Sequence, residues 1–182
     1  RDVYAPLLFE PLRFPSPYHY RCEDCAGQDG CSCVERLGDV LAEHGEQVAA
    51  VIIEPRVQGA GGMVVAPEGH IARVRRLCDA YDVLLIADEV ATGFGKTGAM
   101  FACDLEGVTP DLMVLGKGIT GGYLPLSATV ATGRIYDAFY DARDEARKLF
   151  HGHTYAGNPI CCAAALANID LFEREDVLRR VR

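Results

Sequence analysis

The sequence lacks any apolar run that approaches the length of a membrane span, so we expect no transmembrane helix. It also lacks a basic excess: 18 Lys and Arg stand against 26 Asp and Glu, and the net charge of -8 argues against a nucleic-acid partner. No signal-peptide pattern follows the first residue, Arg1, and we expect the chain to derive from a longer or processed protein. The hydrophobic fraction of 49% over 182 residues is typical of a globular domain with its own core.

Cysteine, by contrast, is plentiful, with eight residues. Four are expected to be small buried side chains: Cys78, Cys103, Cys161 and Cys162. The other four form a C-x-x-C pair followed by C-x-C: Cys22, Cys25, Cys31 and Cys33. This cluster could hold a structural zinc ion, in which case the chain could be a non-enzymatic metal-binding or interaction module. Against this, the second pair is separated by one residue and no His lies in the cluster. We favour reduced cysteines in a loop of a cytoplasmic protein, and therefore predict no metal.

The order of apolar and amphipathic segments predicts an α/β domain with a mainly parallel sheet flanked by helices. Residues 1–33, which contain Pro6, Pro11, Pro15 and Pro17, are expected to form an extended arm and loop. Helices are predicted at 34–45, 67–81, part of 134–149 and 159–173, and strands at 48–53, 83–87, 112–115 and 127–132.

The patterns also predict which side chains are buried. The apolar run 48–53 is typical of a strand buried on both faces. In the helix at 67–81, Tyr81 is expected on the buried stripe with Ile71, Val74 and Leu77, whereas Arg75 is expected to face water. Asn158 is the expected N-cap of the last helix.

Three charged residues come directly after predicted strands: Glu54, Asp88 and, after one glycine, Lys117. Because ligands bind at the carboxyl ends of parallel strands, these side chains should converge on one edge of the sheet. A lysine that can form a Schiff base and an acid that keeps a pyridine nitrogen protonated are what pyridoxal phosphate requires. The pair Asp88 and Lys117 therefore predicts a pyridoxal phosphate site.

Each residue also has a plainer interpretation. A partly desolvated Asp88 needs a cation or hydrogen bonds, and it could obtain them by capping the next segment or pairing with a nearby Lys or Arg. Lys117 stands between Gly116 and Gly118, which would let a planar cofactor come close to the backbone, and we expect an apolar pocket around its amine. The alternative is a solvated loop lysine.

Two further segments are candidates for the pocket. Glu54 and Gln58 lie in the glycine-rich loop after the first strand, where they are expected to line the site. Thr154 precedes the start of the last helix, and a hydroxyl beside a helix N-terminus suits a phosphate. His151 and His153 lack a neighbouring carboxylate and are a poor set of metal ligands.

Taken together, these segments resemble class III aminotransferases, which have fold type I and use pyridoxal phosphate. The resemblance rests on Ile53-Glu54-Pro55 with Gln58-Gly59, on Ala87 to Gly95, on Gly116-Lys117-Gly118 and on His153 to Pro159. It implies that residues 48–182 are the central part of the cofactor-binding large domain. Residues 1–47 would then be an arm, a cysteine-containing loop and a helix that leads into the core.

The resemblance also implies roles for individual residues. Lys117 would form the Schiff base and move a proton between substrate and cofactor, and Asp88 would pair with the pyridine nitrogen. Val90 would pack on a ring face, Gln58 would approach the phenolic oxygen, and Glu54 would shape the substrate side. In a homodimer with shared sites, Thr154 would bind the phosphate of the neighbouring subunit's cofactor.

Three stretches favour the branch of the family that acts in biotin synthesis with S-adenosylmethionine or lysine as amino donor: residues 4–10, 116–125 and 150–155. Other class III enzymes that act on ω-amino acids or diamines share much of this pattern, and a racemase or decarboxylase of the same fold is a further alternative. Lys96 stands where the family usually has arginine, which would weaken any bidentate contact. The family's phosphate loop, stacking aromatic residue and substrate-carboxylate arginine are not in these residues, so we expect this piece alone to be inactive.

Overall fold

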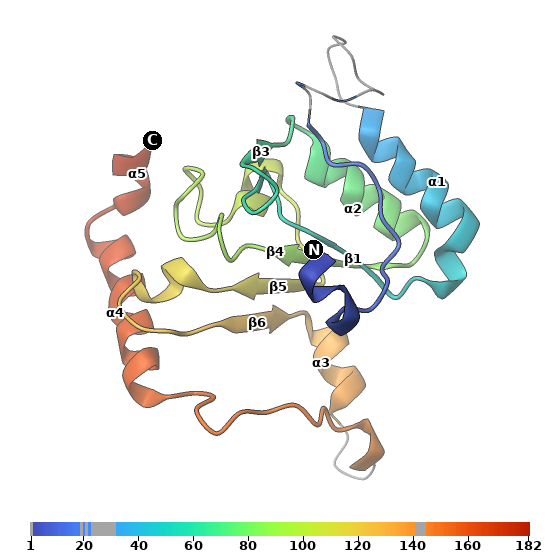
Figure 1. Cartoon of the computed structure of the whole chain (residues 1–182). Helices are drawn as coiled ribbons and strands as arrows, with labels where there is room; N and C mark the ends of the chain where they lie inside the picture. The colour runs from blue at the N-terminus through green and yellow to red at the C-terminus, as the bar shows by residue number, and fades with distance from the viewer. Residues whose placement is uncertain (1, 19, 21, 23–31, 141–144) are drawn as a thin grey trace.

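The computed structural model describes residues 2–18, 20, 22, 32–140 and 145–182 (Figure 1). Its centre is a four-stranded sheet in the order β1 (Ala50–Ile53), β4 (Leu84–Asp88), β5 (Leu112–Leu115) and β6 (Ala128–Ala131). The first three strands run parallel, and β6 is antiparallel to β5. A short antiparallel pair, β2 (Val57–Gln58) and β3 (Val64–Val65), follows β1. The predicted α/β class with a mainly parallel sheet is confirmed.

The predicted helices lie near their expected positions, and α5 is a short helix that the sequence pattern did not predict. The helices are α1 (Glu35–His44), α2 (His70–Ala80), α3 (Gly133–Phe139), α4 (Pro159–Arg174) and α5 (Val177–Val181), with 3-10 turns at η1 (Asp2–Leu7), η3 (Ser32–Val34), η4 (Gly45–Gln47), η5 (Ala102–Glu106), η6 (Lys117–Thr120) and η7 (Glu145–Arg147). The second helix begins later than predicted because Gly69, with φ 79°, adopts a left-handed conformation just before His70. Asn158 caps α4 as predicted, since its Oδ1 accepts hydrogen bonds from the amides of Ile160 and Cys161.

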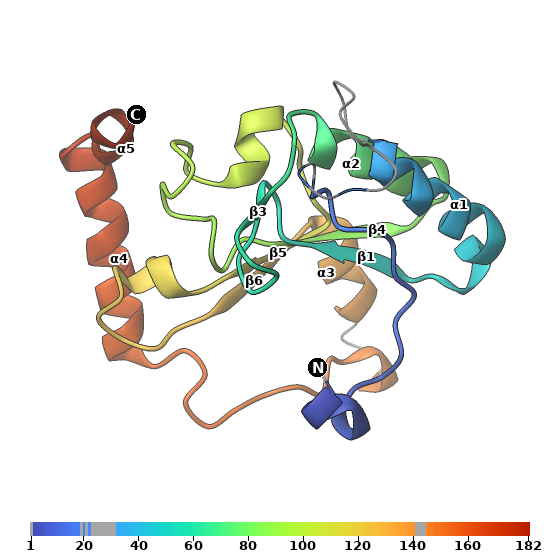
Figure 2. The ribbon, with the colours of Figure 1, turned by 45° about the horizontal axis from the view of Figure 1, so that its top comes forward.

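One face of the sheet carries the main core. Figures 1 and 2 show α1 and α2 together on one side of the sheet, whereas the N-terminal arm begins with η1 on the other side and then runs past β1 toward α1. The buried core residues of these elements are Val34, Leu37, Leu41, Val51, Ile53, Ile71, Val74, Cys78, Leu85 and Ala87. The expectation that the first strand is buried on both faces is wrong, because Ile52 points to the arm side and is 64% exposed. Tyr81 is also exposed, and Cys78 takes its place on the buried stripe of α2.

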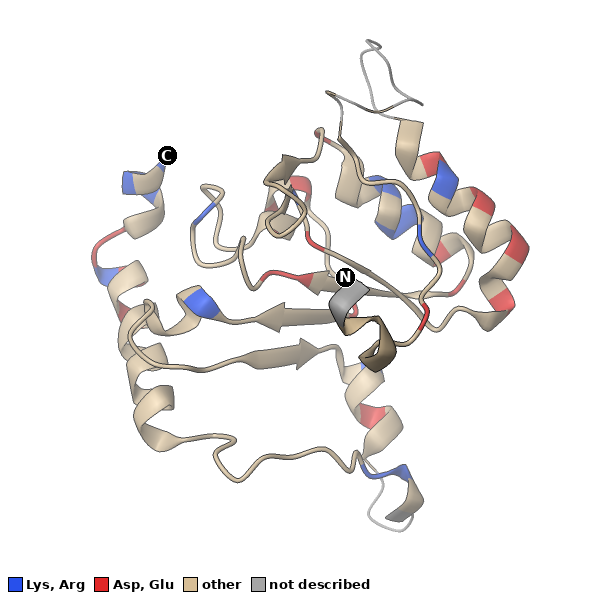
Figure 3. Cartoon of the chain, viewed as in Figure 1, with Lys and Arg blue, Asp and Glu red and all other residues tan. Residues whose placement is uncertain are grey.

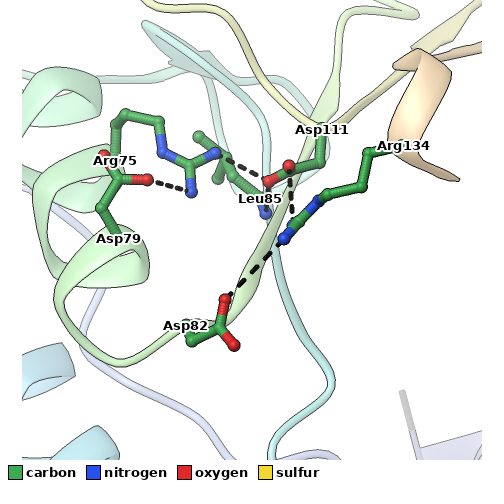
Figure 4. A network of polar contacts seen from close by, with 6 residues as sticks. All are labelled: Arg75, Asp79, Asp82, Leu85, Asp111 and Arg134. Carbon is green, nitrogen blue, oxygen red and sulfur yellow. Dashed lines mark hydrogen bonds and ion pairs between the residues drawn. The ribbon is translucent and has the colours of Figure 1, made fainter.

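Arg75 does not face water, contrary to the expectation from its helix. Figure 4 shows its guanidinium between Asp79, one turn along α2, and Asp111, the residue before β5. The Asp111 carboxylate also accepts a hydrogen bond of 2.8 Å from the amide of Leu85. Burial would raise the pKa of Asp111, but the Leu85 amide and Arg75 together lower it below its usual value. This network joins α2 to the amino ends of β4 and β5, opposite the edge that carries Asp88.

The cysteines divide only in part as the sequence suggests, because Cys162 is less buried than expected and Cys33 of the loop cluster is fully buried. Cys78, Cys103 and Cys161 are buried and Cys162 is half-buried. Burial raises the pKa of the Cys78 thiol to about 11 and also raises that of Cys103. Cys25 and Cys31 of the predicted cluster lie outside the described residues, whereas buried Cys33 packs against Cys22. Among the described residues no group of three potential metal ligands comes together, and no described helix is long and apolar enough to span a membrane.

The burial of His70 leads us to expect that the free energy of unfolding depends on pH. Its side chain is 3% exposed, and within the described chain neither ring nitrogen has a hydrogen-bond partner. Burial, with a smaller contribution from the Arg73 charge, lowers its pKa from 6.5 to about 4. The unfolded chain therefore binds a proton before the folded chain does, and stability present above pH 6.5 is lost as the pH falls toward 4, by up to roughly 3 kcal/mol.

The measurement is the free energy of unfolding of the full-length protein between pH 7 and pH 4, compared with that of His70→Leu. We expect the leucine variant to lose less stability over this interval, because it has no imidazole to protonate. Equal pH slopes for the two proteins would contradict the prediction.

Candidate active site

The three predicted charged residues lie at the same edge of the sheet. Asp88 is the last residue of β4, Glu54 follows β1 directly, and Lys117 follows β5 after Gly116. The register pairs Ile53 with Ala87, so Glu54 and Asp88 end neighbouring strands. Figure 3 shows the acidic end of β4 next to the basic turn η6 at the end of β5. The convergence expected from topology is therefore present.

Asp88 is half-buried and makes a tight turn with its own chain. Its Oδ1 accepts a hydrogen bond of 3.0 Å from the amide of Val90. The capping interpretation is thus correct for one oxygen. Among the described residues Asp88 has no ion-pair partner, and its Oδ2 makes no hydrogen bond. A half-buried carboxylate with one unused oxygen suits a cationic N–H donor.

The neighbouring Glu89 anchors this turn in the core and has no simple signal in the sequence pattern. Its side chain is 0% exposed. Its carboxylate accepts hydrogen bonds from the Thr92 hydroxyl at 2.5 Å and from the Cys103 amide at 2.8 Å. Its own amide donates to the carbonyl of Val114 on β5. Glu89 therefore fixes the backbone between Asp88 and Val90, and only the tertiary structure reveals this.

Lys117 has an unusual backbone for a lysine. Its φ is +40°, in the left-handed region that residues with a Cβ rarely occupy. Such strain is concentrated at functional sites and persists only where surrounding contacts enforce it. The side chain is exposed and makes no ion pair or hydrogen bond with the described residues, so the expected apolar enclosure is not formed by this chain. The amine is instead open to a ligand.

Val90 connects the two strand ends. A Cβ built on Gly116 would lie only 3.2 Å from Cγ1 of Val90, so the valine packs on the backbone just before Lys117. A Cβ on Gly118 would lie 2.9 Å from Cβ of Phe94, which belongs to the same loop as Val90. Close packing therefore favours glycine at both positions, most strongly at Gly118, where a Cβ would come within 2.9 Å of another side-chain atom.

Asp88 and Lys117 line two different hollows of this chain. The first, of about 470 Å³, is lined by Glu54, Gln58 and Asp88 together with residues of the arm, among them Arg13 and Ser16. The second, of about 690 Å³, is lined by Lys117, Lys96, Gly118, Tyr123, Asn168 and Phe172. The arm residues are a component that sequence reasoning missed, because some forty positions separate Ser16 from Gln58.

Glu54 and Gln58 both face the first hollow, as expected. Glu54 Oε2 accepts a hydrogen bond of 2.9 Å from the amide of Gly59, which closes the loop after β1. The Ser16 hydroxyl donates to Gln58 Oε1 and so ties the arm to this loop. Lys96 is exposed, and within the described chain it makes no ion pair, so a bidentate arginine contact has no counterpart here.

Thr154 lies apart from the sheet edge. It belongs to the exposed segment 149–157 that leads from η7 to α4 along the far side of β6 (Figure 1). Within this segment the amide of Tyr155 donates to Nδ1 of His153 at 3.2 Å. The structure therefore does not bring Thr154 together with Asp88 and Lys117 in one chain. Its predicted role requires a second subunit.

The donor set fits pyridoxal phosphate at the sheet edge. Asp88 offers a partly desolvated carboxylate oxygen for a protonated ring nitrogen, and Lys117 offers an open amine. The glycines around Lys117 keep side chains away from the backbone there. A phosphate-binding group, by contrast, is not evident among the described residues of this edge.

Comparison with known proteins identifies the family of the chain. The family model for aminotransferase class III matches residues 5–182. The chain belongs to the class III aminotransferase family, whose members depend on pyridoxal phosphate. It is 53% identical, over 98% of its length, to the adenosylmethionine-8-amino-7-oxononanoate aminotransferase of Geobacter sulfurreducens. It is 42% identical, over 99% of its length, to an omega-aminotransferase of Caulobacter vibrioides.

Solved structures show the same relationship. The chain matches the adenosylmethionine-8-amino-7-oxononanoate aminotransferase of Methanocaldococcus jannaschii with a TM-score of 0.87 and 42% identity over 98% of its residues. It matches an amine transaminase of an uncultivated Pseudomonas species, in its PLP-bound form, with a TM-score of 0.83 and 43% identity over 91% of its residues. The chain spans 40% of the Geobacter protein, 42% of the Caulobacter protein, and 39% and 38% of the two solved chains.

Proposed function

We propose that the full protein is a pyridoxal phosphate-dependent aminotransferase of biotin synthesis. It would convert 7-keto-8-aminopelargonate into 7,8-diaminopelargonate, with S-adenosylmethionine or lysine as the amino donor. The observation that carries this proposal is the 53% identity over 98% of the chain to a relative of that name. The sheet-edge geometry of Asp88 and Lys117 supports the class of chemistry, and we propose a cytoplasmic location for the enzyme.

Individual residues of this chain would hold the cofactor and transfer protons. When bound, pyridoxal phosphate supplies an electron sink for carbanion chemistry at the substrate. The amine of Lys117 would hold the cofactor at its aldehyde carbon and later carry a proton at the substrate carbon. Asp88 Oδ2 would accept the hydrogen bond of the ring N–H and keep that proton in place. Val90 would pack on a ring face.

The first hollow would serve the cofactor and the substrate. Gln58 would approach the phenolic oxygen, and Glu54 would shape the substrate side. The placement of both side chains beside Asp88 in one hollow supports these roles. Ser16, which holds Gln58, would connect the arm to the same site.

We also propose a homodimer with shared active sites, in which Thr154 binds the phosphate of the neighbouring subunit's cofactor. The separation of Thr154 from the sheet edge of its own chain supports this arrangement. Exposed apolar side chains in both the arm and the segment before α4 favour burial against a second subunit: Leu7, Phe9, Leu149, Phe150 and Tyr155. Residues 48–182 would be the central part of the large domain and inactive without the rest of the protein.

A substrate comparison tests the proposed activity. The purified full-length protein is assayed with 7-keto-8-aminopelargonate and either S-adenosylmethionine or lysine, and separately with ω-amino acids and diamines. With 7-keto-8-aminopelargonate as acceptor, we expect kcat/KM for the preferred donor, S-adenosylmethionine or lysine, to exceed that for ω-amino acids and other diamines by at least about 100-fold, because a site built for specific polar groups rejects analogues that lack them. The second candidate function is an ω-amino acid or diamine transaminase, which the similarity to the Caulobacter omega-aminotransferase supports. Preference for ω-amino acids or diamines as donors would favour this function.

A further inference from the structure

The geometry points to Asn168 of α4 as a positioning residue for Lys117: its side-chain amide holds the turn that carries this lysine in the left-handed conformation. The inference rests on the proposed function, because it takes Lys117 to be the residue that holds the cofactor. Asn168 is 51 positions from Lys117 in the sequence, and neither the spacing of the motifs nor the family match assigns it a role.

The need for such a residue follows from the backbone of Lys117. With φ at +40°, this residue occupies a conformation that L side chains rarely adopt. Two residues later the chain continues through buried Ile119 and Thr120, and then Gly121 turns left-handed again with φ at 63°. Contacts on the turn η6 must therefore enforce a shape that its sequence alone would not favour.

Asn168 supplies these contacts directly. Its Nδ2 donates to the carbonyl of Gly118 at 2.9 Å and to the carbonyl of Ile119 at 3.3 Å. These are the two residues that directly follow Lys117. Its Oδ1 lies 3.1 Å from the point where a Cβ of Gly121 would stand. One planar amide thus contacts three residues of the turn, and its two N–H groups match the two carbonyls.

The position of Asn168 is itself fixed by packing. Ala165, one turn earlier on α4, is buried in a cluster with Phe94, Leu115 and Ile119. Figure 1 shows α4 standing beside η6 at the carboxyl end of β5. Because a site is held more firmly by groups on rigid elements, a helix anchored by this cluster is a suitable support for the lysine.

The chemistry of the contact requires a donor. A leucine has nearly the same shape as asparagine but would leave both carbonyls without Nδ2, and an aspartate would place carboxylate oxygens against them. Either change should let the turn relax and Lys117 leave its left-handed conformation. The lysine would remain in the chain but would no longer be held toward the cofactor.

The test uses the full-length protein with Asn168→Leu and Asn168→Asp, and Ala167→Asp as a control that adds a charge to an exposed position of the same helix. Hydrogen exchange is measured on the cofactor-free proteins at the amides of Ile119 and Gly121. We expect exchange there to accelerate by about tenfold or more in both Asn168 variants, with β4 and β5 amides unchanged. The control should exchange at the wild-type rate.

A second set of readouts reports on the site with pyridoxal phosphate added. The pH midpoint of the bound cofactor's visible band should shift in both Asn168 variants, and kcat should fall by about tenfold or more while KM for the amino donor changes less than about twofold. A role in stability alone would leave the midpoint in place. If the leucine and aspartate variants prove unstable, Asn168→Ser, with its shorter hydroxyl donor, is measured in the same way.

The outcomes separate this inference from the proposed function. Wild-type exchange at Ile119 and Gly121, or an unchanged midpoint, in a folded Asn168 variant would overturn the positioning role. Undiminished cofactor attachment in Lys117→Ala would instead overturn the proposed function, whatever the Asn168 variants show. Accelerated exchange with a shifted midpoint, in a protein that needs Lys117 for attachment, supports both.

Discussion

Replacement of Lys117 by alanine in the full-length protein is expected to abolish covalent attachment of pyridoxal phosphate and to lower kcat by at least about 10³-fold. The physical reason is that one amine would serve both as the group that holds the cofactor and as the proton carrier, and general acid–base catalysis alone contributes about 10²- to 10⁴-fold. Attachment is measured by borohydride reduction followed by mass spectrometry of the peptide that contains residue 117.

The matched control is Lys148→Ala, which removes an exposed lysine directly after η7, outside the segment 149–157 and away from the sheet edge. This variant should retain attachment and turnover. The prediction would be contradicted by a cofactor label on a lysine other than Lys117 in the wild-type protein, or by normal turnover of Lys117→Ala. Either result would show that Lys117 is not the lysine that attaches the cofactor.

The second large effect is expected for Asp88→Asn. Asparagine keeps the oxygen that accepts the 3.0 Å hydrogen bond from the Val90 amide, so the turn after β4 should persist. It removes the negative charge that would hold the ring proton. Loss of one well-placed electrostatic contact in a partly desolvated site typically lowers kcat by about 10²- to 10³-fold, and we expect a decrease of this size.

Asp104→Asn is the matched control for this variant. Asp104 also accepts a backbone hydrogen bond, from the amide of Phe101 at 3.0 Å, but it is exposed on η5. Steady-state kinetics and thermal unfolding are measured for both variants. We expect wild-type kcat for Asp104→Asn and nearly wild-type unfolding for both. Each tenfold change in rate corresponds to about 1.4 kcal/mol of activation free energy. A kcat of Asp88→Asn within about twofold of the wild type would therefore mean that the Asp88 charge contributes almost nothing to the transition state, and it would exclude the ring-nitrogen role.

Much of the fold could be predicted from local pattern. The strand Leu112–Leu115 was predicted with its observed bounds, and the cap Asn158 marked the start of α4 correctly. Both depend on neighbouring residues only, namely a short apolar run and a side chain that reaches the next amides. The expected burial of Tyr81 and exposure of Arg75 failed because they depend on neighbours distant in sequence. Asp111, which pairs with Arg75, is 36 positions away.

The sequence by itself determined the α/β class, the three charged residues at strand ends and the resemblance to class III aminotransferases, because strand direction alone puts Glu54, Asp88 and Lys117 on one edge. Only the tertiary structure decided how this edge is built. It brought the arm beside Gln58, buried Glu89 under the turn of Asp88, and put the amide of Asn168 on the turn of Lys117. These contacts join segments far apart in the chain, and no periodicity or local spacing encodes such pairings.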